Sequence, residues 1–249
     1  MHVPVELLIF LVGIIGAFIS GIAAGSGIIV ISALLFFGIP PHIALGTSNF
    51  GDVGSKLGNI LRFSKSKNMG VLRRDVIALT LICVPATIIG SLIVVSINEE
   101  ILSKLIGIIL LIIFPILFIN RNLGLKENRA VGKKRIISHI AYFFASAWSG
   151  FFSPGAGFLE TFIRIRGYGY TILQGKAVTR IPLVLSGIGS VLVFAFSDLI
   201  NYRYAVTLFL GMMIGGYIGT DFAIKKGDKW LKPLLGLIIL GTAIKMILS

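Results

Sequence analysis

The sequence predicts an all-α integral membrane protein with two inverted repeats, each made of a broken, re-entrant helical hairpin and three transmembrane helices. Three observations lead to this prediction: a high apolar content, landmarks that recur in the two halves, and Lys and Arg concentrated in four loops. The chain has 249 residues, of which 56% are hydrophobic and 13% are charged, and its mean hydropathy is +0.98. Soluble domains carry about 25% charged residues, so we expect much of this surface to face lipid.

Composition excludes several other classes of protein. Cys83 is the only cysteine, which excludes a disulfide scaffold, and the abundance of Ile, Leu, Val and Phe excludes a disordered chain. The net charge of +13 does not indicate nucleic-acid binding, because the basic residues lie in loops between apolar segments. The apolar start at 5–19 has no Lys or Arg before it and continues into further apolar sequence, so we expect it to be retained.

Six segments are apolar over the length of about 20 residues that a membrane crossing needs. In chain order they are 43–61, 76–97, 101–119, 171–196, 205–224 and 231–248. Two further apolar segments, 5–37 and 136–165, are too long for one crossing and are interrupted near the middle by glycine, in the second case with Pro154. Glycine and proline disfavour a continuous helix, so each segment has two short arms. We therefore predict two hairpins that enter the membrane and return.

The two halves of the chain repeat each other. We predict a first repeat at 1–120, a basic linker at 121–135 and a second repeat at 136–249. The matched landmarks, in order, are Ser20-Gly21 with Ser149-Gly150, Thr47 with Thr179, Ser55, Gly58 and Phe63 with Ser186, Gly189 and Phe194, and Gly90 with Gly219.

The distribution of basic residues predicts the orientation. Four loops, at 62–74, 121–135, 164–180 and 225–232, hold five, six, four and four Lys or Arg. The positive-inside rule places these loops in the cytoplasm. A hairpin followed by three crossings then inserts the two halves in opposite directions, so the repeats are predicted to be inverted. We expect a multi-pass protein of the cell membrane.

The breaks predict a binding site for an anion. A helix that restarts after a break presents free N–H groups and its positive dipole end inside the membrane. Arg180 lies several residues inside an apolar helix, where its planar fork suits an oxyanion; the alternative is that it snorkels to the cytoplasmic edge. The predicted substrate-binding residues are Gly25, Ser26, Gly27, Thr47, Ser48, Asn49, Ser153, Gly155, Gly157, Thr179 and Arg180.

Other ionisable residues lie in apolar segments. Asp52 and Lys56, spaced i to i+4, are predicted to form an ion pair rather than a proton relay. Glu160 and Asp221 are carboxylates in positions that commonly mark ion pathways, but each has a basic residue four positions later that could neutralise it. We therefore assign neither of them a coupling role.

Signatures of enzymes are missing from the sequence. There is no phosphate-binding loop, no G-x-S-x-G and no histidine or cysteine at metal-ligand spacing, so no cofactor, no metal and no enzymatic activity are predicted. Ser149 with His139 allows an intramembrane protease as an alternative. Against it, the repeat counterpart Ser20 has no histidine nearby.

The two Gly-rich breaks, each followed about 20 residues later by Thr47 or Thr179 near the start of a helix, resemble the TauE/SafE sulfite exporter family. The resemblance covers essentially the whole chain. Arg180 stands where that family commonly has a small polar residue. The resemblance implies a secondary transporter of the cell membrane that exports or exchanges small sulfur-containing anions such as sulfite, sulfoacetate or thiosulfate.

The expected partners are a small anionic substrate, either a sulfur oxyanion or an organosulfonate, and the lipid bilayer. No nucleic-acid partner is predicted, and a homo-oligomer is compatible with the sequence. We expect transport by alternating access about a midplane site. Two alternatives stay open from the sequence: a passive anion channel and a membrane scaffold subunit without transport.

Overall fold

The computed structural model describes residues 4–22, 26–65, 73–98, 100–102, 130–153 and 156–248; of residues 28, 158 and 227–248 it describes the backbone alone. Every regular element in these ranges is helical, as predicted. The elements are α1 (Val5–Ile22), α2 (Ser26–Phe36), α3 (Pro41–Ser64), α4 (Arg73–Val95), α6 (Lys133–Phe151), α7 (Ala156–Phe162), the π-helical turn η1 (Ile163–Gly167), α8 (Ile172–Phe196) and α9 (Tyr202–Leu248).

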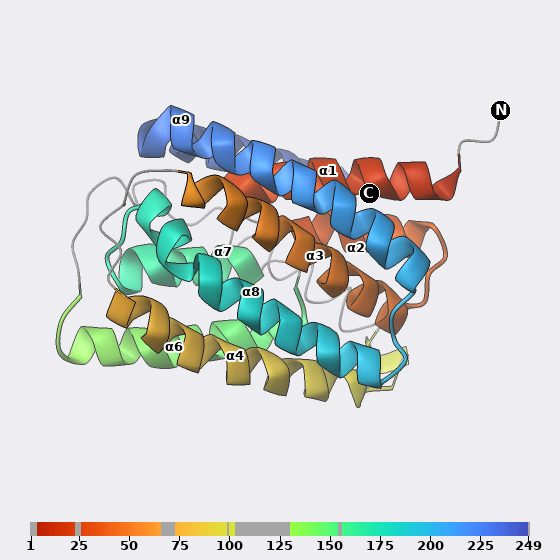
Figure 1. Ribbon diagram of the computed structural model, residues 1–249, viewed down its shortest axis with the longest axis horizontal. Helices are drawn as coiled ribbons and strands as arrows, with labels where there is room; N and C mark the ends of the chain where they lie inside the picture. Colours follow the sequence, from red (N-terminus) through yellow and green to blue (C-terminus); the bar gives the residue numbers. More distant parts are fainter. Residues whose placement is uncertain are drawn as a thin grey trace.

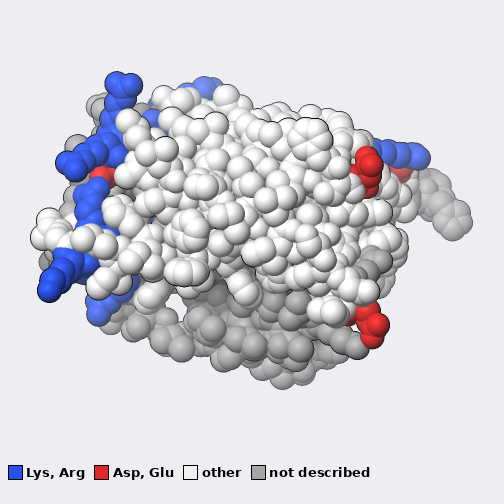
Figure 2. Space-filling model, turned by 90° about the horizontal axis from the view of Figure 1, so that it is seen from below, with Lys and Arg blue, Asp and Glu red and all other residues white. Residues whose placement is uncertain are grey.

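Among the described residues, four helices are long and apolar enough to cross a membrane: α1, α4, α8 and the Tyr202–Lys226 part of α9. Large apolar side chains such as Leu81 and Phe144 are exposed on this surface, which suits contact with lipid. Figure 2 shows that Lys and Arg gather at one end of the face it displays, while the middle of that face is uncharged. This end, left in Figure 1, is where α3 ends and α4 begins, and we call it the basic end.

Two antiparallel helical hairpins enter the bundle from opposite ends (Figure 1). In the first, α1 runs toward the basic end and α2 runs back, so that a Cβ added at Gly16 of α1 would lie 3.1 Å from Val30 of α2. In the second, α6 starts at the basic end and α7 returns toward it. The predicted segments 5–37 and 136–165 therefore each fold back on themselves.

The first helix of each hairpin packs against a helix of the other half. A Cβ added at Gly21 of α1 would lie 2.8 Å from the carbonyl carbon of Gly219 in α9. A Cβ added at Gly150 of α6 would lie 1.9 Å from the carbonyl oxygen of Thr87 in α4, and one at Gly90 would approach α6 as closely. These glycines allow the backbones to come together without an intervening side chain.

The centre of the bundle is formed by α3 and α8, which contact each other between α9 on one side and α4 on the other (Figure 1). At the end opposite the basic end, the starts of α3 and α9 meet the ends of α4 and α8 in a buried apolar cluster, which we call the apolar plug. Its buried members are Ile31, Leu45, Val94, Leu102, Phe152, Phe194, Ile200 and Ala205.

The structure differs from the sequence prediction at the C-terminal end. The expected loop at 225–232 is helical, and α9 runs as one helical element through both predicted ranges, 205–224 and 231–248. The physical reason is local: Lys and Leu favour helix, and the one glycine of this loop costs about 1 kcal/mol. Most of the helix expected at 101–119 and most of the linker at 121–135 lie outside the described residues.

Candidate functional site

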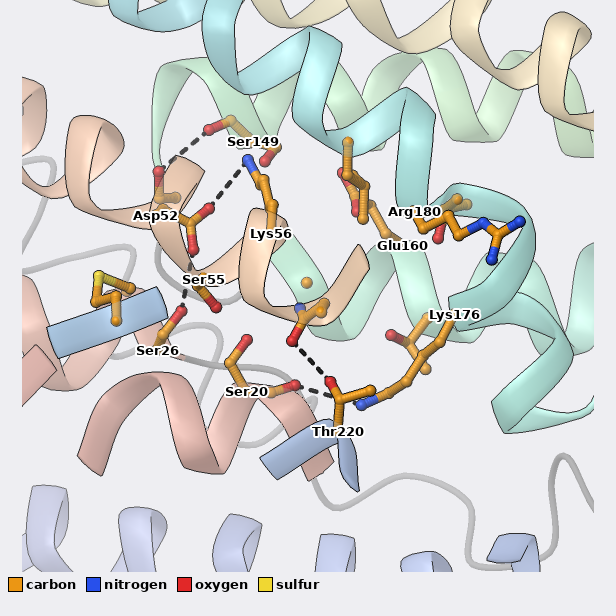
Figure 3. Close-up of a pocket in the computed structure, with 18 of the residues that line it drawn as sticks. Ser20, Ser26, Asp52, Ser55, Lys56, Ser149, Glu160, Lys176, Arg180 and Thr220 are labelled. Atoms are coloured by element: carbon orange, nitrogen blue, oxygen red, sulfur yellow. Dashed lines mark hydrogen bonds and ion pairs between the residues drawn. The ribbon is translucent and has the colours of Figure 1, made fainter. Parts of the chain in front are cut away.

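A cavity of about 120 Å³ lies where α3, α8 and α9 meet the breaks of both hairpins (Figure 3). This volume accommodates a small polyatomic ion together with water. Its lining is rich in residues with hydroxyl groups, which come from both halves of the chain. They are Ser20, Ser26, Ser48, Ser55, Ser149, Ser153, Thr161, Thr179 and Thr220.

The cavity lies toward the basic end of the bundle. On α8 its lining residues fall within 176–183, the first half of the helix, and on α3 they extend over 48–63, close to the end of that helix. Because α8 begins and α3 ends at the basic end, the cavity lies nearer this end of the two helices. The apolar plug lies at their opposite end.

The structure brings most of the predicted binding residues to this cavity. Those that line it are Ser26, Gly27, Ser48, Ser153, Gly157, Thr179 and Arg180. Gly25 and Gly155 lie outside the described residues. Thr47 and Asn49 do not line the cavity, although both are buried.

Thr47 and Asn49 have structural contacts instead. The Thr47 Oγ1 accepts a hydrogen bond from the backbone N–H of Asn201 at 3.1 Å, which fixes the start of α9 to α3. The Asn49 Oδ1 accepts one from Ser153 Oγ at 3.2 Å, so Asn49 supports the cavity wall from behind. Ser48 is the residue of this turn that reaches the cavity.

An ion pair crosses the α3 wall of the cavity. The Lys56 Nζ lies 3.0 Å from Asp52 Oδ2, which confirms the predicted pair. The other oxygen of Asp52 lies 3.5 Å from the hydroxyl of Ser26 at the start of α2 (Figure 3). This contact connects the first break to α3.

A second ion pair lies on the opposite wall. The Arg164 Nη1 is 3.4 Å from Glu160 Oε2, and the two side chains are 6% and 5% exposed. Arg164 also donates a hydrogen bond of 2.6 Å to Thr161 Oγ1. The pair therefore joins α7 to η1, and it neutralises the carboxylate that the sequence left without a role.

Lys176 and Arg180 are cations of the cavity wall, and neither forms an ion pair with a carboxylate of the described residues. The Lys176 Nζ donates hydrogen bonds to the backbone carbonyls of Ser20, at 3.3 Å, and of Gly21. A cation at these carbonyls stabilises the negative dipole end of α1. In Figure 3 the guanidinium of Arg180 extends away from the Asp52–Lys56 pair.

Positive charge is therefore in excess in the cavity. The lining includes four cationic side chains, Lys56, Arg164, Lys176 and Arg180, and two carboxylates, Asp52 and Glu160. Together with the hydroxyl donors, this excess favours an anion.

Two ionic clusters lie closer to the basic end. Asp221 of α9 pairs with Arg62 of α3 at 2.5 Å and with Lys225 at 2.7 Å. Asp75 of α4 accepts hydrogen bonds from Arg135, at 2.5 Å, and from Tyr170. The hydrogen bond to Asp75 raises the pKa of the Arg135 guanidinium above its usual value. Both clusters connect helices of the two halves.

The sequence prediction omitted several residues that the structure places in the cavity. Asp52, Lys56, Glu160, Arg164 and Lys176 line it but were not assigned to the binding set. The sequence contained a signal that could have found them. Each is an ionisable residue within or beside an apolar segment, and such residues commonly face a bundle interior.

The protease alternative finds no support in the geometry. The Nδ1 of His139 lies 2.8 Å from the hydroxyl of Tyr168. His139 and Ser149 are ten residues apart on α6, or about 15 Å along the helix axis. Within the described ranges, no three His, Cys, Asp or Glu residues are grouped as a metal site would require.

Comparison with known proteins identifies the family. The model of the sulfite exporter TauE/SafE family matches residues 9–246. The chain belongs to this family. It is similar to a probable membrane transporter protein of Haemophilus influenzae, at 24% identity over 99% of this chain and 97% of the relative. It is also similar to the probable membrane transporter proteins YfcA of Escherichia coli, at 22% identity over 92% and 85% of the two chains, and YdhB of Bacillus subtilis, at 26% over 94% and 98%.

No solved structure matches this TauE/SafE chain. Its relatives are named as transporters without a substrate. This protein is thus a membrane transporter of the TauE/SafE family, and the nature of its substrate has to be argued from the cavity.

Proposed function

We propose that this protein is a secondary transporter that exports or exchanges small sulfur-containing anions, such as sulfite, sulfoacetate or thiosulfate, by alternating access. The observation that carries the proposal is the cavity between the two halves, whose lining has four cationic side chains, two carboxylates and nine Ser or Thr residues. Sulfite and sulfonate groups offer several acceptor oxygens in a small volume, and such a lining can satisfy them.

The contacts between helices support inverted repeats. Each hairpin packs against a helix of the other half, with Gly21 on α9 and Gly150 on α4. The contact of α3 with α9 likewise has a counterpart in the contact of α8 with α4. Such reciprocal packing of each half on the other is expected of two repeats related by a pseudo-twofold axis. Interrupted helices at this axis are typical of secondary transporters.

The position of the cavity supports one state of an alternating-access cycle. The apolar plug closes the end where α3 and α9 begin, and the cavity lies toward the basic end. If the basic loops face the cytoplasm, as the positive-inside rule requires, this conformation is inward-facing. Release of the anion on the cytoplasmic side, or its uptake from there for export, would take place from this state.

Counterflow in proteoliposomes tests the proposal. Liposomes loaded with unlabelled sulfite should accumulate labelled sulfite against its gradient, whereas a passive channel should not and a scaffold should show no flux. Arg180→Ala should raise KM about 10- to 100-fold, since a hydrogen bond between charged groups contributes about 1.5–3 kcal/mol. Arg73→Ala, which removes an exposed cation outside the cavity, is the control. Equal effects of the two variants would remove Arg180 from the site.

A further inference from the structure

A second cavity, of about 370 Å³, lies on the hairpin formed by α6, α7 and η1 and shares no residue with the substrate cavity. We call it the hairpin groove. Its floor is apolar and includes Ile137, Ala141 and Phe162, and its rim carries Lys134 and Arg166.

The floor of the hairpin groove is open on the surface of the bundle. Ile137 is 65% exposed and Phe162 is 42% exposed, and the neighbouring Ile140 and Phe144 on α6 are also exposed. In a membrane transporter such a surface faces hydrocarbon, so the occupant of the groove has to be at least partly an acyl chain.

The rim of the hairpin groove is cationic. Lys134 and Arg166 are both exposed, and no Asp or Glu of the described residues lies within ion-pair distance of either. Lys134 belongs to the first turn of α6, at the basic end of the molecule. Lys134 and Arg166, for which the described part of the chain supplies no carboxylate partner, lie beside an apolar groove at the expected membrane boundary. They are complementary to a ligand with an anionic head and an apolar tail.

We propose that the hairpin groove binds an anionic phospholipid, with an acyl chain against Ile137, Ala141 and Phe162 and with the phosphate of its headgroup between Lys134 and Arg166. A zwitterionic phospholipid matches the apolar floor equally well but gains less at the rim, because its headgroup has no net charge.

The turn η1 connects this lipid site to the substrate cavity. Arg164 and Arg166 belong to the same π-helical turn, and Arg164 is buried in the substrate cavity while Arg166 is exposed at the groove. At its end, a Cβ added to Gly167 would lie 2.8 Å from the hydroxyl of Ser138, so the turn lies directly on α6. A lipid bound at Arg166 therefore stabilises the turn that positions Arg164.

Native mass spectrometry of the purified full chain in detergent tests the proposal without any transport measurement. The protein is titrated with phosphatidylglycerol, with phosphatidylcholine of the same acyl chains, and with glycerol phosphate as the headgroup alone. We expect phosphatidylglycerol to bind best. The double variant Lys134→Ala/Arg166→Ala should bind it about 30-fold more weakly, because each basic residue near an anionic lipid contributes a factor of about five.

The matched control is Arg73→Ala/Arg74→Ala, which removes two exposed cations from the same end but outside the groove. This variant should bind phosphatidylglycerol as the wild type does. Phe162→Ala should weaken both phospholipids, because it removes part of the apolar floor. Equal binding of the two phospholipids, or equal losses in the two double variants, would overturn the proposal. Binding of glycerol phosphate as tight as that of phosphatidylglycerol would show a phosphate site and not a lipid site.

Discussion

The two halves of the molecule have polar contacts at matching positions, but their surroundings differ. Between α4 and α8, the Oγ atoms of Ser91 and Ser190 lie 2.7 Å apart, and both side chains are fully buried. Between α3 and α9, Thr220 Oγ1 lies 2.7 Å from the side-chain amide of Asn59, and both residues line the cavity. Thr220 follows Gly219 as Ser91 follows Gly90, and Asn59 follows Gly58 as Ser190 follows Gly189.

The helix contacts are thus alike in the two halves, while access to the cavity is not. The Ser91 hydroxyl is also within hydrogen-bond distance of the Gly150 carbonyl, at 3.3 Å, so the α4–α8 contact includes α6. The α3–α9 contact borders the cavity. In an alternating-access cycle the two contacts would exchange these roles, so the α4–α8 contact has to separate for the protein to open toward the other side.

The largest expected effect comes from preventing that separation. In a Cys83→Ala background, Ser91→Cys/Ser190→Cys places two thiols where hydroxyls are now 2.7 Å apart, within reach of a disulfide. Oxidation should abolish counterflow of labelled anion almost completely, and reduction should restore it. The measurement is counterflow in proteoliposomes before and after a reducing agent.

Each single cysteine variant serves as the control and should keep its transport under oxidation. Full transport by a protein shown by mass to be completely cross-linked would mean that α4 and α8 do not separate here. The difference between the two contacts would then be a fixed asymmetry and not one stage of a cycle.

A smaller effect is expected from the two ion pairs of the cavity. Arg164→Gln leaves Glu160 buried at 5% exposure and should lower the free energy of unfolding by about 3–5 kcal/mol. Lys56→Gln leaves Asp52 at 24% exposure, where the loss should be about 1 kcal/mol or less. Denaturant titration in mixed micelles measures both.

The double variant Glu160→Gln/Arg164→Gln identifies the cause of the stability loss in Arg164→Gln. It should recover much of the stability lost in Arg164→Gln, because the uncompensated buried charge is gone. If the double variant is as unstable as the single one, the loss arises from packing around Arg164 rather than from its charge.

Alanine substitutions at the glycines where helices pack most closely are expected to have the next largest effect. Gly150→Ala places a Cβ 1.9 Å from the carbonyl oxygen of Thr87, whereas Gly21→Ala places one 2.8 Å from the carbonyl carbon of Gly219. Both should destabilise the protein by about 1–3 kcal/mol, with the larger loss at Gly150. Gly189→Ala is the control for thermal unfolding, since its Cβ would meet only side-chain atoms of Ile88, which can move. Similar losses in all three variants would show that helix propensity, and not the crossing, sets the effect.

Features that depend on neighbours in the sequence could be predicted. Glycine and proline end helices locally, and α1 and α6 end at Ile22 and Phe151, next to the glycines of the two predicted breaks. Asp52 and Lys56 pair because an i to i+4 spacing puts them on one face of α3. Contacts between distant segments could not be predicted. Lys176 binds carbonyls at the end of α1, and Asp221 binds Arg62, only because the helices pack in this arrangement.

The predicted match of Thr47 with Thr179 differs by one residue from the register given by the other landmarks. The ungapped register of Ser55 with Ser186 instead pairs Ser48 with Thr179, and both of these line the cavity. One residue rotates a side chain by about 100° around a helix, so this shift moves Thr47 from the cavity wall to the back of α3. Short motifs rich in small residues do not align the two halves of the chain to within one residue.

The substitutions with the smallest expected effect test whether Ser48, and not Thr47, faces the cavity. Thr47→Val removes the acceptor for the Asn201 N–H, and should cost about 1 kcal/mol of stability without changing KM, because Thr47 does not face the cavity. Ser48→Ala should do the reverse and raise KM a few-fold with little loss of stability, because it removes a cavity hydroxyl. Thermal unfolding and initial rates of anion uptake separate the two quantities. If Thr47→Val changed KM and Ser48→Ala did not, the register derived from the glycine breaks would hold, and α3 would have to be rotated relative to the cavity.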